Sequence, residues 1–574
     1  MDDQLQSDEP GWPQRAVILI AVGAVAALIV QQLMQPEDWH RGHGAWRDAC
    51  ATGVGVAALA FGFGLGRVRI AWTMAFAPAL GLLAGLIQYW NGQPNGLWTW
   101  SGASLVLAVA IAVPLFQVAR DEGRLSLPYS QVHGHAWTNI VLWGACWGFT
   151  GIVVLLSHLL AELFALIGID FLKDWLSHHW SNALIIGAAF GAALGLLRDR
   201  DRVVRLLQRV VTSVLGFLAP ILGVALILFL LSLPFTGLSK LWEATKSTTP
   251  VLMACVIGAL ILANAVIGHG PDDEAKSPVL RWSALALGVA VLPLAIIAAV
   301  AMGLRIGQYG MTPDRLWGLT VVVFAVAYGL VYLADAVRGR LGWASLVRRD
   351  NIRIALATMV AGLVLATPIL GFNAISTNDQ VARLKSGKVS ADKFDWAALA
   401  FDFGEPGERA LAELRRSANA EIAQRADDAA KANGRYEVGD QLKNQRRQAE
   451  VANLRVLPAG TVLPADLRKG IADSEQCDAG QCTIFFLVPN KQAIVMDNGC
   501  FTDPPASAWM NCGDPVAWYR YENGWAVGTR TAAQPDAAAI VARNAAYKVG
   551  KAEVRTVTRR QVFIGGVPVG PDFE

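Results

Sequence analysis

Charged residues are scarce in this chain, and histidine is absent from its second half. Asp, Glu, Lys and Arg make up only 17% of the 574 residues, whereas hydrophobic residues make up 54% and the mean hydropathy is +0.39. This composition excludes a soluble multidomain protein and predicts a membrane protein with a soluble part. The net charge is only +3, and the basic residues lie in short loops without interleaved aromatics, which argues against nucleic acid as a partner.

Because His269 is the last histidine, a Ser-His-Asp arrangement is excluded from the C-terminal region. Cysteine is also rare, but four of the seven cysteines lie close together: Cys477, Cys482, Cys500 and Cys512. Structural zinc sites favour two close ligand pairs such as CxxC, which this spacing lacks. We therefore expect two disulfides and no metal, with a four-thiolate zinc site as the less favoured alternative. Proximity alone favours Cys477 with Cys482 and Cys500 with Cys512.

A helix needs about 20 apolar residues to cross the hydrocarbon layer, and eleven segments approach or reach that length. They are residues 16–34, 49–65, 71–90, 98–118, 137–160, 183–197, 211–233, 250–267, 282–304, 316–333 and 354–372. The second and sixth are short, so the count of about eleven holds within one or two. The first has no small-residue cleavage pattern, and we expect an uncleaved anchor.

Loop charges predict the orientation. With the N-terminus in the cytoplasm, the inner loops hold most of the Lys and Arg residues, as the positive-inside rule requires. An odd number of crossings then places everything after Phe372 outside. Disulfides persist in an oxidising compartment such as the periplasm, so the cysteines support the same orientation without sharing residues with the loop charges. We expect a multi-pass protein of the bacterial inner membrane.

The predicted architecture is a polytopic α-helical membrane bundle with a C-terminal periplasmic α+β domain. Its expected divisions are a transmembrane domain (1–375), a helical segment (376–455) with Ser390 as first N-cap, and a disulfide-stapled β-rich module (456–574). Residues 483–488 with 492–496, and 516–521 with 525–528, have the β-prone composition and turn residues of two hairpins. A helix over 535–547 and a strand pair around 554–569 follow.

Polar groups within or beside the spans are few, and such groups mark transport paths, relays or sites. The candidates are His158, Glu162, Asp170, Asn264, Arg305 and Arg315. His158 and Glu162 are four residues apart and share a helix face, and the two arginines suit an anionic group. The competing structural interpretation is that interfacial hydrogen bonds tie an outer loop to the bundle. By topology, the histidine pairs at 133/135 and 178/179 lie on opposite sides and cannot share a metal.

Small residues recur at a spacing that lets helix backbones approach closely. Gly187, Gly191 and Gly195 follow one another every fourth residue, as do Gly81 with Gly85 and Gly144 with Gly148. This pattern predicts close helix packing at each of the three places.

Several motifs resemble a known bacterial inner-membrane family. They are LFALIGIDFL at 163–172, LPFTGL at 233–238, QYGMTPDRLW at 308–317 and VARLKSGKVSADKFDWAALAFDFGEPGERAL at 381–411. The chain from 137 to 411 is similar to the family named domain of unknown function 4153, and the last motif is the most specific. The resemblance implies a polytopic inner-membrane protein whose motif-bearing segments face the periplasm. It brings no reaction, substrate or catalytic residue.

Three function classes follow from these features. A binding or envelope-organising role through the exported domain is favoured, with the lipid bilayer and an envelope protein or polymer as partners. A transporter or channel for a small solute or lipid is the alternative, although intramembrane charges are scarce. An envelope enzyme using His158 and Glu162 is the third, so an enzymatic role is the less favoured outcome. Catalytic residues are not identified, and no cofactor is expected.

Overall fold

The computed structural model describes residues 12–35, 44–91, 99–237, 248–438, 454–474, 482–497, 516–521, 524–527, 542, 545–546, 558, 560–564 and 567–573. The chain divides into two compact units, Met1–Arg383 and Leu384–Glu574. The three-part division expected from the sequence remains a prediction.

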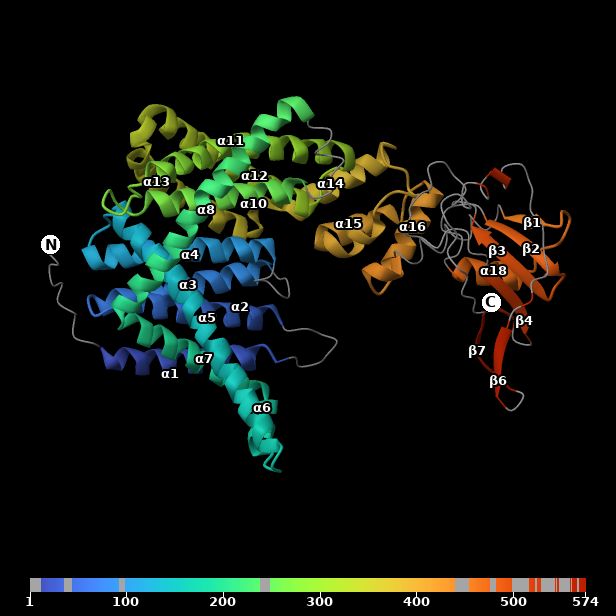
Figure 1. Cartoon of the computed structure of the whole chain (residues 1–574), viewed down its shortest axis with the longest axis horizontal. Helices are drawn as coiled ribbons and strands as arrows, with labels where there is room; N and C mark the ends of the chain where they lie inside the picture. Colours follow the sequence, from blue (N-terminus) through green and yellow to red (C-terminus); the bar gives the residue numbers. More distant parts are fainter. Residues whose placement is uncertain are drawn as a thin grey trace. The chain divides into compact units, whose positions relative to one another are not determined.

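The first unit is helical (Figure 1). Its helices are α1 (Pro13–Leu33), α2 (Ala45–Gly64), α3 (Ile70–Asn91), α4 (Trp100–Glu122), α5 (Tyr129–Ala165), α6 (Phe171–Ser177), α7 (His179–Arg198), α8 (Asp201–Thr236), α10 (Thr248–Ile267), α11 (Pro278–Tyr309), α12 (Pro313–Gly339), α13 (Trp343–Ala366) and α14 (Phe372–Lys385), with the short 3₁₀ turns η2 (Arg340–Gly342) and η3 (Pro368–Leu370). α14 begins in this unit and crosses its boundary.

In the described part of the chain, nine helices are long and apolar enough to span a membrane. A tenth candidate is the pair of α13 with residues 368–385, which is bent by 69°. α2 is a 20-residue helix packed along α3, but it is not among these candidates. The protein is therefore a multi-pass membrane protein with nine or ten candidate spans by composition, and the predicted count of eleven is not confirmed.

Glycines set two of the closest helix contacts. A Cβ on Gly187 or Gly191 would overlap the backbone of α1, and one on Gly195 would lie 2.5 Å from the Cα of Ala16. Gly81 approaches α2 in the same way, at 2.5 Å from the Gly53 carbonyl oxygen. Close packing is confirmed at these two places.

The third glycine pair behaves differently from the prediction. A Cβ on Gly144 or Gly148 of α5 would meet nothing within 4 Å. These two residues therefore sit on an open face of α5, and the expected helix contact there is wrong for the single chain. Spacing alone predicts which glycines share a face, but not whether a partner helix lies against that face.

Short helices begin the second unit: the π-helical turn η4 (Ala398–Asp402), α15 (Gly404–Leu414) and α16 (Ala420–Lys431). The side chain of Asn419 caps α16 by accepting from the backbone N–H groups of Glu421 and Ile422 at 3.0 and 3.3 Å. Ser390 precedes a turn and caps no helix. The expected N-cap at Ser390 is therefore wrong, and the N-cap of α16 is Asn419. An asparagine side chain caps a helix as well as serine does.

A five-stranded sheet follows, in the order β1 (Arg455–Leu457), β2 (Cys482–Val488), β3 (Gln492–Asp497), β4 (Val516–Tyr521) and β5 (Gly524–Val527). β1 is parallel to β2, and α18 (Ala465–Asp473) lies between them in sequence. β2 with β3 and β4 with β5 are antiparallel, so both predicted hairpins are confirmed. Cys482, Ile484 and Phe486 alternate along β2 and pack with Leu467 and Ile471 of α18.

β6 (Arg560–Ile564) and β7 (Val567–Phe573) form a separate antiparallel pair. The predicted terminal pair is present, but it begins several residues later than expected. The predicted helix over 535–547 lies almost entirely outside the described residues.

The contact between α15 and α16 predicts an acid-sensitive element. Asp427 of α16 pairs with Lys431 at 2.5 Å and with Arg415 at 2.6 Å. The hydrogen bond from Lys431, followed by that from Arg415, lowers the pKa of Asp427 below its ordinary value. The stabilisation is therefore fully present above the ordinary aspartate pKa of about 4 and is lost as pH falls through the lowered value.

We expect amide protection of α16, measured by hydrogen exchange of the full chain and corrected for intrinsic rates, to fall only below about pH 4. Asp427→Asn should remove this pH step. Asp428→Asn, the same change one residue on, should leave it in place. A step that persists in Asp427→Asn would assign the effect to another group.

Candidate functional site

The predicted His158 and Glu162 pair lies on the C-terminal half of α5. The Nδ1 atom of His158 is 3.0 Å from the Val154 carbonyl oxygen, and Glu162 accepts a hydrogen bond from Lys173 of α6 at 3.0 Å. Asp170 precedes α6, and its side chain makes no cap hydrogen bond there. The contacts that these groups make are therefore local ones within the α5–α6 corner.

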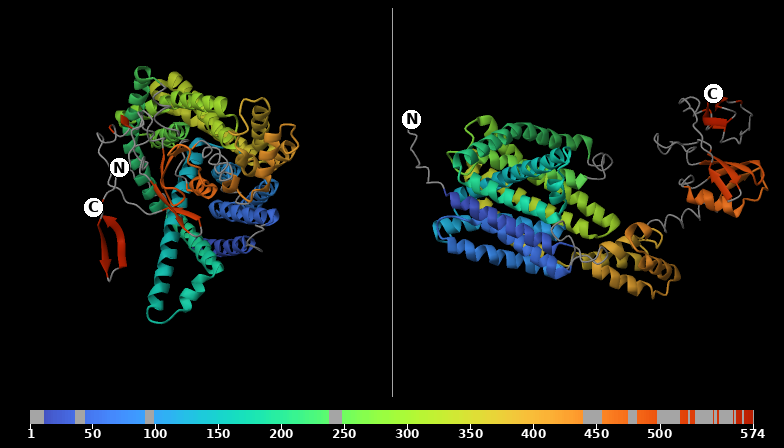
Figure 2. Two further views of the ribbon diagram at one scale, coloured as in Figure 1. Left: turned by 90° about the vertical axis from the view of Figure 1, so that its right-hand side faces the viewer. Right: turned by 90° about the horizontal axis from the view of Figure 1, so that it is seen from below.

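The surroundings of this corner are apolar. Leu155, Leu159, Leu166 and Phe171 are 67, 63, 84 and 75% exposed, and the end of α5 with α6 projects from the other helices in both Figure 1 and Figure 2. With 37 residues, α5 extends for about 55 Å, longer than the roughly 30 Å hydrocarbon layer. Side chains exposed in this way on a membrane protein suit contact with lipid.

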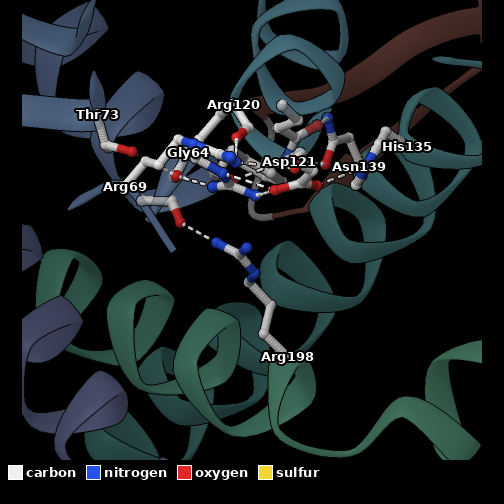
Figure 3. A network of polar contacts seen from close by, with 11 residues as sticks. Gly64, Arg69, Thr73, Arg120, Asp121, His135, Asn139 and Arg198 are labelled. Atoms are coloured by element: carbon white, nitrogen blue, oxygen red, sulfur yellow. Dashed lines mark hydrogen bonds and ion pairs between the residues drawn. The ribbon is translucent and has the colours of Figure 1, made fainter. Parts of the chain in front are cut away.

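Arginines cap helix ends at one end of the bundle (Figure 3). The last carbonyls of α2 accept from side chains of three other helices: Gly62 from Arg198 of α7 at 2.7 Å, Phe63 from Gln117 of α4 at 2.7 Å, and Gly64 from Thr73 of α3 at 2.8 Å and from Arg120 of α4. Helix C-termini leave four carbonyls without partners inside the helix. Cationic donors satisfy these carbonyls and also complement the negative end of the helix dipole.

Two further helices end in the same way. Arg69 donates to the carbonyls of Arg120 and Asp121 at the end of α4, at 2.6 and 2.9 Å. Arg15 of α1 donates to the Arg198 carbonyl at the end of α7, at 3.0 Å. We call Arg15, Arg69, Arg120 and Arg198 the arginine-capped end. In the sequence these residues are recognisable only as loop charges, because the carbonyls they bind come from helices distant in the chain.

The turn between α11 and α12, which carries the QYGMTPDR motif, is fixed by one face of α14. Asp379 accepts from the Met311 N–H at 2.7 Å, Gln380 donates to the Tyr309 and Met311 carbonyls at 3.0 and 2.9 Å, and Arg383 donates to the Gln308 carbonyl at 2.6 Å. Thr312 caps α12, as its sequence position suggests. The motif is thus a docking point for α14.

The two arginines of the candidate site belong to this turn region. Arg315 donates to the carbonyls of Tyr309 and Gly310 at 3.1 and 2.7 Å, and its guanidinium lies 5.5 Å from the Tyr309 ring centroid. Arg305 is half-buried on α11. Arg315 therefore stabilises the turn. The α5–α6 corner lies apart from the α11–α12–α14 region in Figure 1 and in the left view of Figure 2.

Gly310 provides a sharp test of this docking point. Its backbone, with φ 77° and ψ −179°, occupies a region that is essentially restricted to glycine. A Cβ there would also lie 2.6 Å from Gln380 Nε2 and 2.7 Å from Asp379 Oδ2. Gly310→Ala should destabilise the protein by about 2 kcal/mol, measured as a lower thermal-unfolding midpoint. Gly307→Ala, where a Cβ meets nothing within 4 Å, is the matched control and should not lower it.

Asn264 lies in a closed ring of hydrogen bonds between three helices. Its Nδ2 donates to the Tyr332 hydroxyl at 2.7 Å, that hydroxyl donates to Asn351 Oδ1 at 3.1 Å, and Asn351 Nδ2 donates back to Asn264 Oδ1 at 2.8 Å. Tyr332 is 0% exposed. A ring in which each member is satisfied stabilises the junction of α10, α12 and α13. Tyr332 and Asn351 were not predicted.

Arg348 of α13 holds the end of α10. It donates to the Ile267 carbonyl at 2.6 Å and to Glu274 at 2.8 Å, and the Arg348 and Glu274 side chains are only 11 and 17% exposed.

The ring of His133 lies 6.4 Å from that of His269, centroid to centroid. In the described residues, no group of three or more His, Cys, Asp or Glu side chains is arranged to hold a metal ion.

Of the four clustered cysteines, only Cys482 falls within the described residues. It is 0% exposed and begins β2. Cys50, Cys146 and Cys255 are free thiols. Cys146 is buried in the core, whereas Cys50 is exposed on α2. Cys477, Cys500 and Cys512 lie outside the described residues, so the predicted pairing stays a prediction.

Comparison with known proteins gives one match. A family model described as "Domain of unknown function (DUF4153)" matches residues 49–403. No curated protein and no solved structure matches the chain. The match begins nearly ninety residues before the part recognised from motifs and ends within the last motif. The chain belongs to the family of domain of unknown function 4153.

Proposed function

We propose that this protein crosses the bacterial inner membrane eleven times, with its N-terminus in the cytoplasm and its second unit in the periplasm. We further propose that it binds an envelope protein or polymer through that unit. The observation that carries the orientation is the arginine-capped end, where helix starts and helix ends alternate as antiparallel crossings require.

α2 is the helix on which the odd count depends. Arg47 near its start donates to the carbonyls of Leu33 and Gln32, at the end of α1, at 2.8 and 3.0 Å. At its other end, the Gly62 carbonyl accepts from Arg198, whose own carbonyl is capped by Arg15 at the start of α1. α2 therefore runs the length of α1 in the opposite direction. This supports counting α2 as a crossing, despite its weaker composition.

The arginine-capped end also supports a cytoplasmic N-terminus. It gathers arginines at the starts or ends of α1, α3, α4 and α7, and the positive-inside rule places such residues in the cytoplasm. An outward-facing second unit then meets an oxidising compartment, where cystines persist. We propose the disulfides Cys477–Cys482 and Cys500–Cys512. Cys482 is completely buried and is not a free thiol, which supports a disulfide at that residue.

Thiol counting tests this proposal. Of seven cysteines, three are free thiols in the described residues. Denatured full-length protein, prepared without reductant, should take up alkylating reagent at Cys50, Cys146 and Cys255 only, and at all seven sites after reduction. Alkylation of Cys482 without reductant would refute the cystine.

The binding role rests on the presence of a separate second unit and on the packing of the membrane unit. α14, the helix that leads into the second unit, is held through Asp379, Gln380 and Arg383 on the turn between α11 and α12. These contacts fix the last helix of the membrane unit within that unit. The buried clusters around α10, α11 and α12, in which many side chains are 0% exposed, suit an anchor.

Complementation separates binding from transport. In a strain that lacks the gene, a chain ending at residue 438 keeps every described helix of the bundle but lacks the sheet module. A binding role predicts that this chain, produced at normal level, fails to restore envelope integrity and lipid profile. Full restoration by it would instead favour transport by the bundle. Asn264→Leu in the full chain is the converse variant, which should retain function if the module is the active part.

The transport alternative keeps one specific observation, the ring of Asn264, Tyr332 and Asn351 inside the bundle. The enzyme alternative has less support, because His158 and Glu162 face an apolar corner. If the chain ending at residue 438 restored function and Asn264→Leu in the full chain abolished it, transport would be favoured over binding.

A further inference from the structure

Asp335, on the last turns of α12, is a buried carboxyl that no sequence pattern singles out. Its side chain is 1% exposed. Its Oδ2 atom finds no hydrogen-bond donor among the described residues. An ionised carboxylate in such a place lacks both water and a donor, which costs several kcal/mol unless the group is neutralised. Burial therefore disfavours the charged form.

A close polar neighbour of Asp335 is another carboxyl. Asp350 of α13 lies within hydrogen-bonding reach of it. Asp350 is itself bound by Arg349 at 3.1 Å and by Arg353 at 3.0 Å. Two carboxylates in contact do not both stay ionised, and the one with cationic partners keeps the charge. The proton thus belongs on Asp335, whose O–H can donate to Asp350.

The remaining charged group on these helices that acts on the pair is Arg338 of α12. It stands on the same element as Asp335, whereas Arg349 and Arg353 stand on α13. The three arginines offset the charge of one carboxylate and prevent Asp350 from taking the proton. They leave the Oδ2 atom of Asp335 without a donor of its own.

This pair is close in sequence to two members of the hydrogen-bonded ring described above. Tyr332 lies one turn before Asp335 on α12, and Asn351 follows Asp350 on α13. The ring of hydroxyl and amide groups at the junction of α10, α12 and α13 therefore involves residues that are one turn or one residue from the carboxyl pair in the sequence. A buried carboxyl in a membrane bundle is a typical proton site.

We propose that Asp335 is a proton-binding site, with Asp350 as the carboxylate that accepts its hydrogen bond. The ligand is a proton, and the site belongs to the membrane unit alone. It therefore stands independently of the proposed binding role of the second unit and of the proposed orientation.

Carbodiimide labelling tests the proposal. Dicyclohexylcarbodiimide adds to a protonated carboxyl in apolar surroundings to give a stable N-acylurea, and no group leaves. We expect mass spectrometry of the purified full chain to find the label on Asp335 at neutral pH, with labelling decreasing as pH rises. Glu421 of α16, whose side chain is 57% accessible and paired with Arg425, is an internal control outside the spans and should stay unlabelled. If Asp335 stays unlabelled after reaction for hours at every pH from about 5 to 9, the proposal is wrong.

A second measurement covers the chance that a variant misfolds. The infrared carbonyl stretch of a protonated carboxyl should be present in the wild-type protein at neutral pH, and should vanish in Asp335→Asn. Asp350→Asn should keep that band but shift it, because the hydrogen-bond acceptor changes from a carboxylate to an amide. Absence of the band from folded wild-type protein contradicts the proposal without reference to any variant.

Discussion

Gly191→Ala is expected to lower the thermal stability of the protein, although it adds a single carbon atom and improves helix propensity. The new Cβ would overlap the Leu19 carbonyl oxygen and lie 2.9 Å from the Ile20 backbone nitrogen. Backbone atoms do not rotate away, so α1 and α7 must separate along their shared face. Overpacking of this kind costs about 1–3 kcal/mol, and Gly187 and Gly195 make the same contact more extensive.

The measurement is the unfolding midpoint of purified full-length protein, followed by the fluorescence of its 20 tryptophans. Gly148→Ala is the matched control, because it makes the same change in a spanning helix where a Cβ meets nothing within 4 Å. There, the helix propensity of alanine should leave the midpoint unchanged or raise it. Equal midpoints for the two variants would show that α1 and α7 do not pack through their backbones.

Arg348→Ala is expected to be comparably destabilising, for an electrostatic reason. The change removes donors from the Ile267 and Gly270 carbonyls and from Glu274. Among the described residues, the cation left beside Glu274 would be Arg281, at 3.0 Å. Breaking a buried ion pair leaves an uncompensated charge and costs up to about 3–5 kcal/mol, with the lower end applying to this pair since both side chains are slightly exposed.

Arg349→Ala provides the comparison, because Arg349 is the next residue but its side chain is 57% exposed. Exposed ion pairs contribute about 0–1 kcal/mol, so its midpoint should stay close to that of the unchanged protein. The same fluorescence measurement applies to both variants. A larger loss for Arg349→Ala than for Arg348→Ala would place the stabilising contacts elsewhere on α13.

Local patterns in the sequence predict much of the fold. Apolar length predicts the spanning helices, Thr312 and Pro313 predict the start of α12, and the turn residues Asn490 and Gly524 mark the two hairpins. These features depend on neighbours within a few residues. The parallel pairing of β1 with β2 and the intervening α18 depend on a distant register, and the prolines and glycine of residues 456–464 suggested only a boundary there.

The polar sites were harder to predict, because each joins helices far apart in the chain. Asn264 stands out in the sequence as a polar residue in a span, but its partners Tyr332 and Asn351 are 68 and 87 residues away. His158 and Glu162 do lie on adjacent turns of one helix, yet Glu162 pairs with Lys173. The sequence does not single out Asp335, because it follows the end of the apolar run 316–333. A charged side chain near the end of a span is usually solvated. Its burial in the folded structure distinguishes the Asp335 carboxyl from such side chains.

The side of the membrane on which the second unit lies is the central claim, and paired reporter fusions after residue 438 test it most directly. Alkaline phosphatase needs disulfides and is active only in the periplasm, whereas green fluorescent protein exported in unfolded form stays dark there. Eleven crossings from a cytoplasmic N-terminus predict an active phosphatase and a dark fluorescent fusion. An inactive phosphatase with a bright fluorescent fusion would contradict this placement, since it requires an even number of crossings or the opposite orientation.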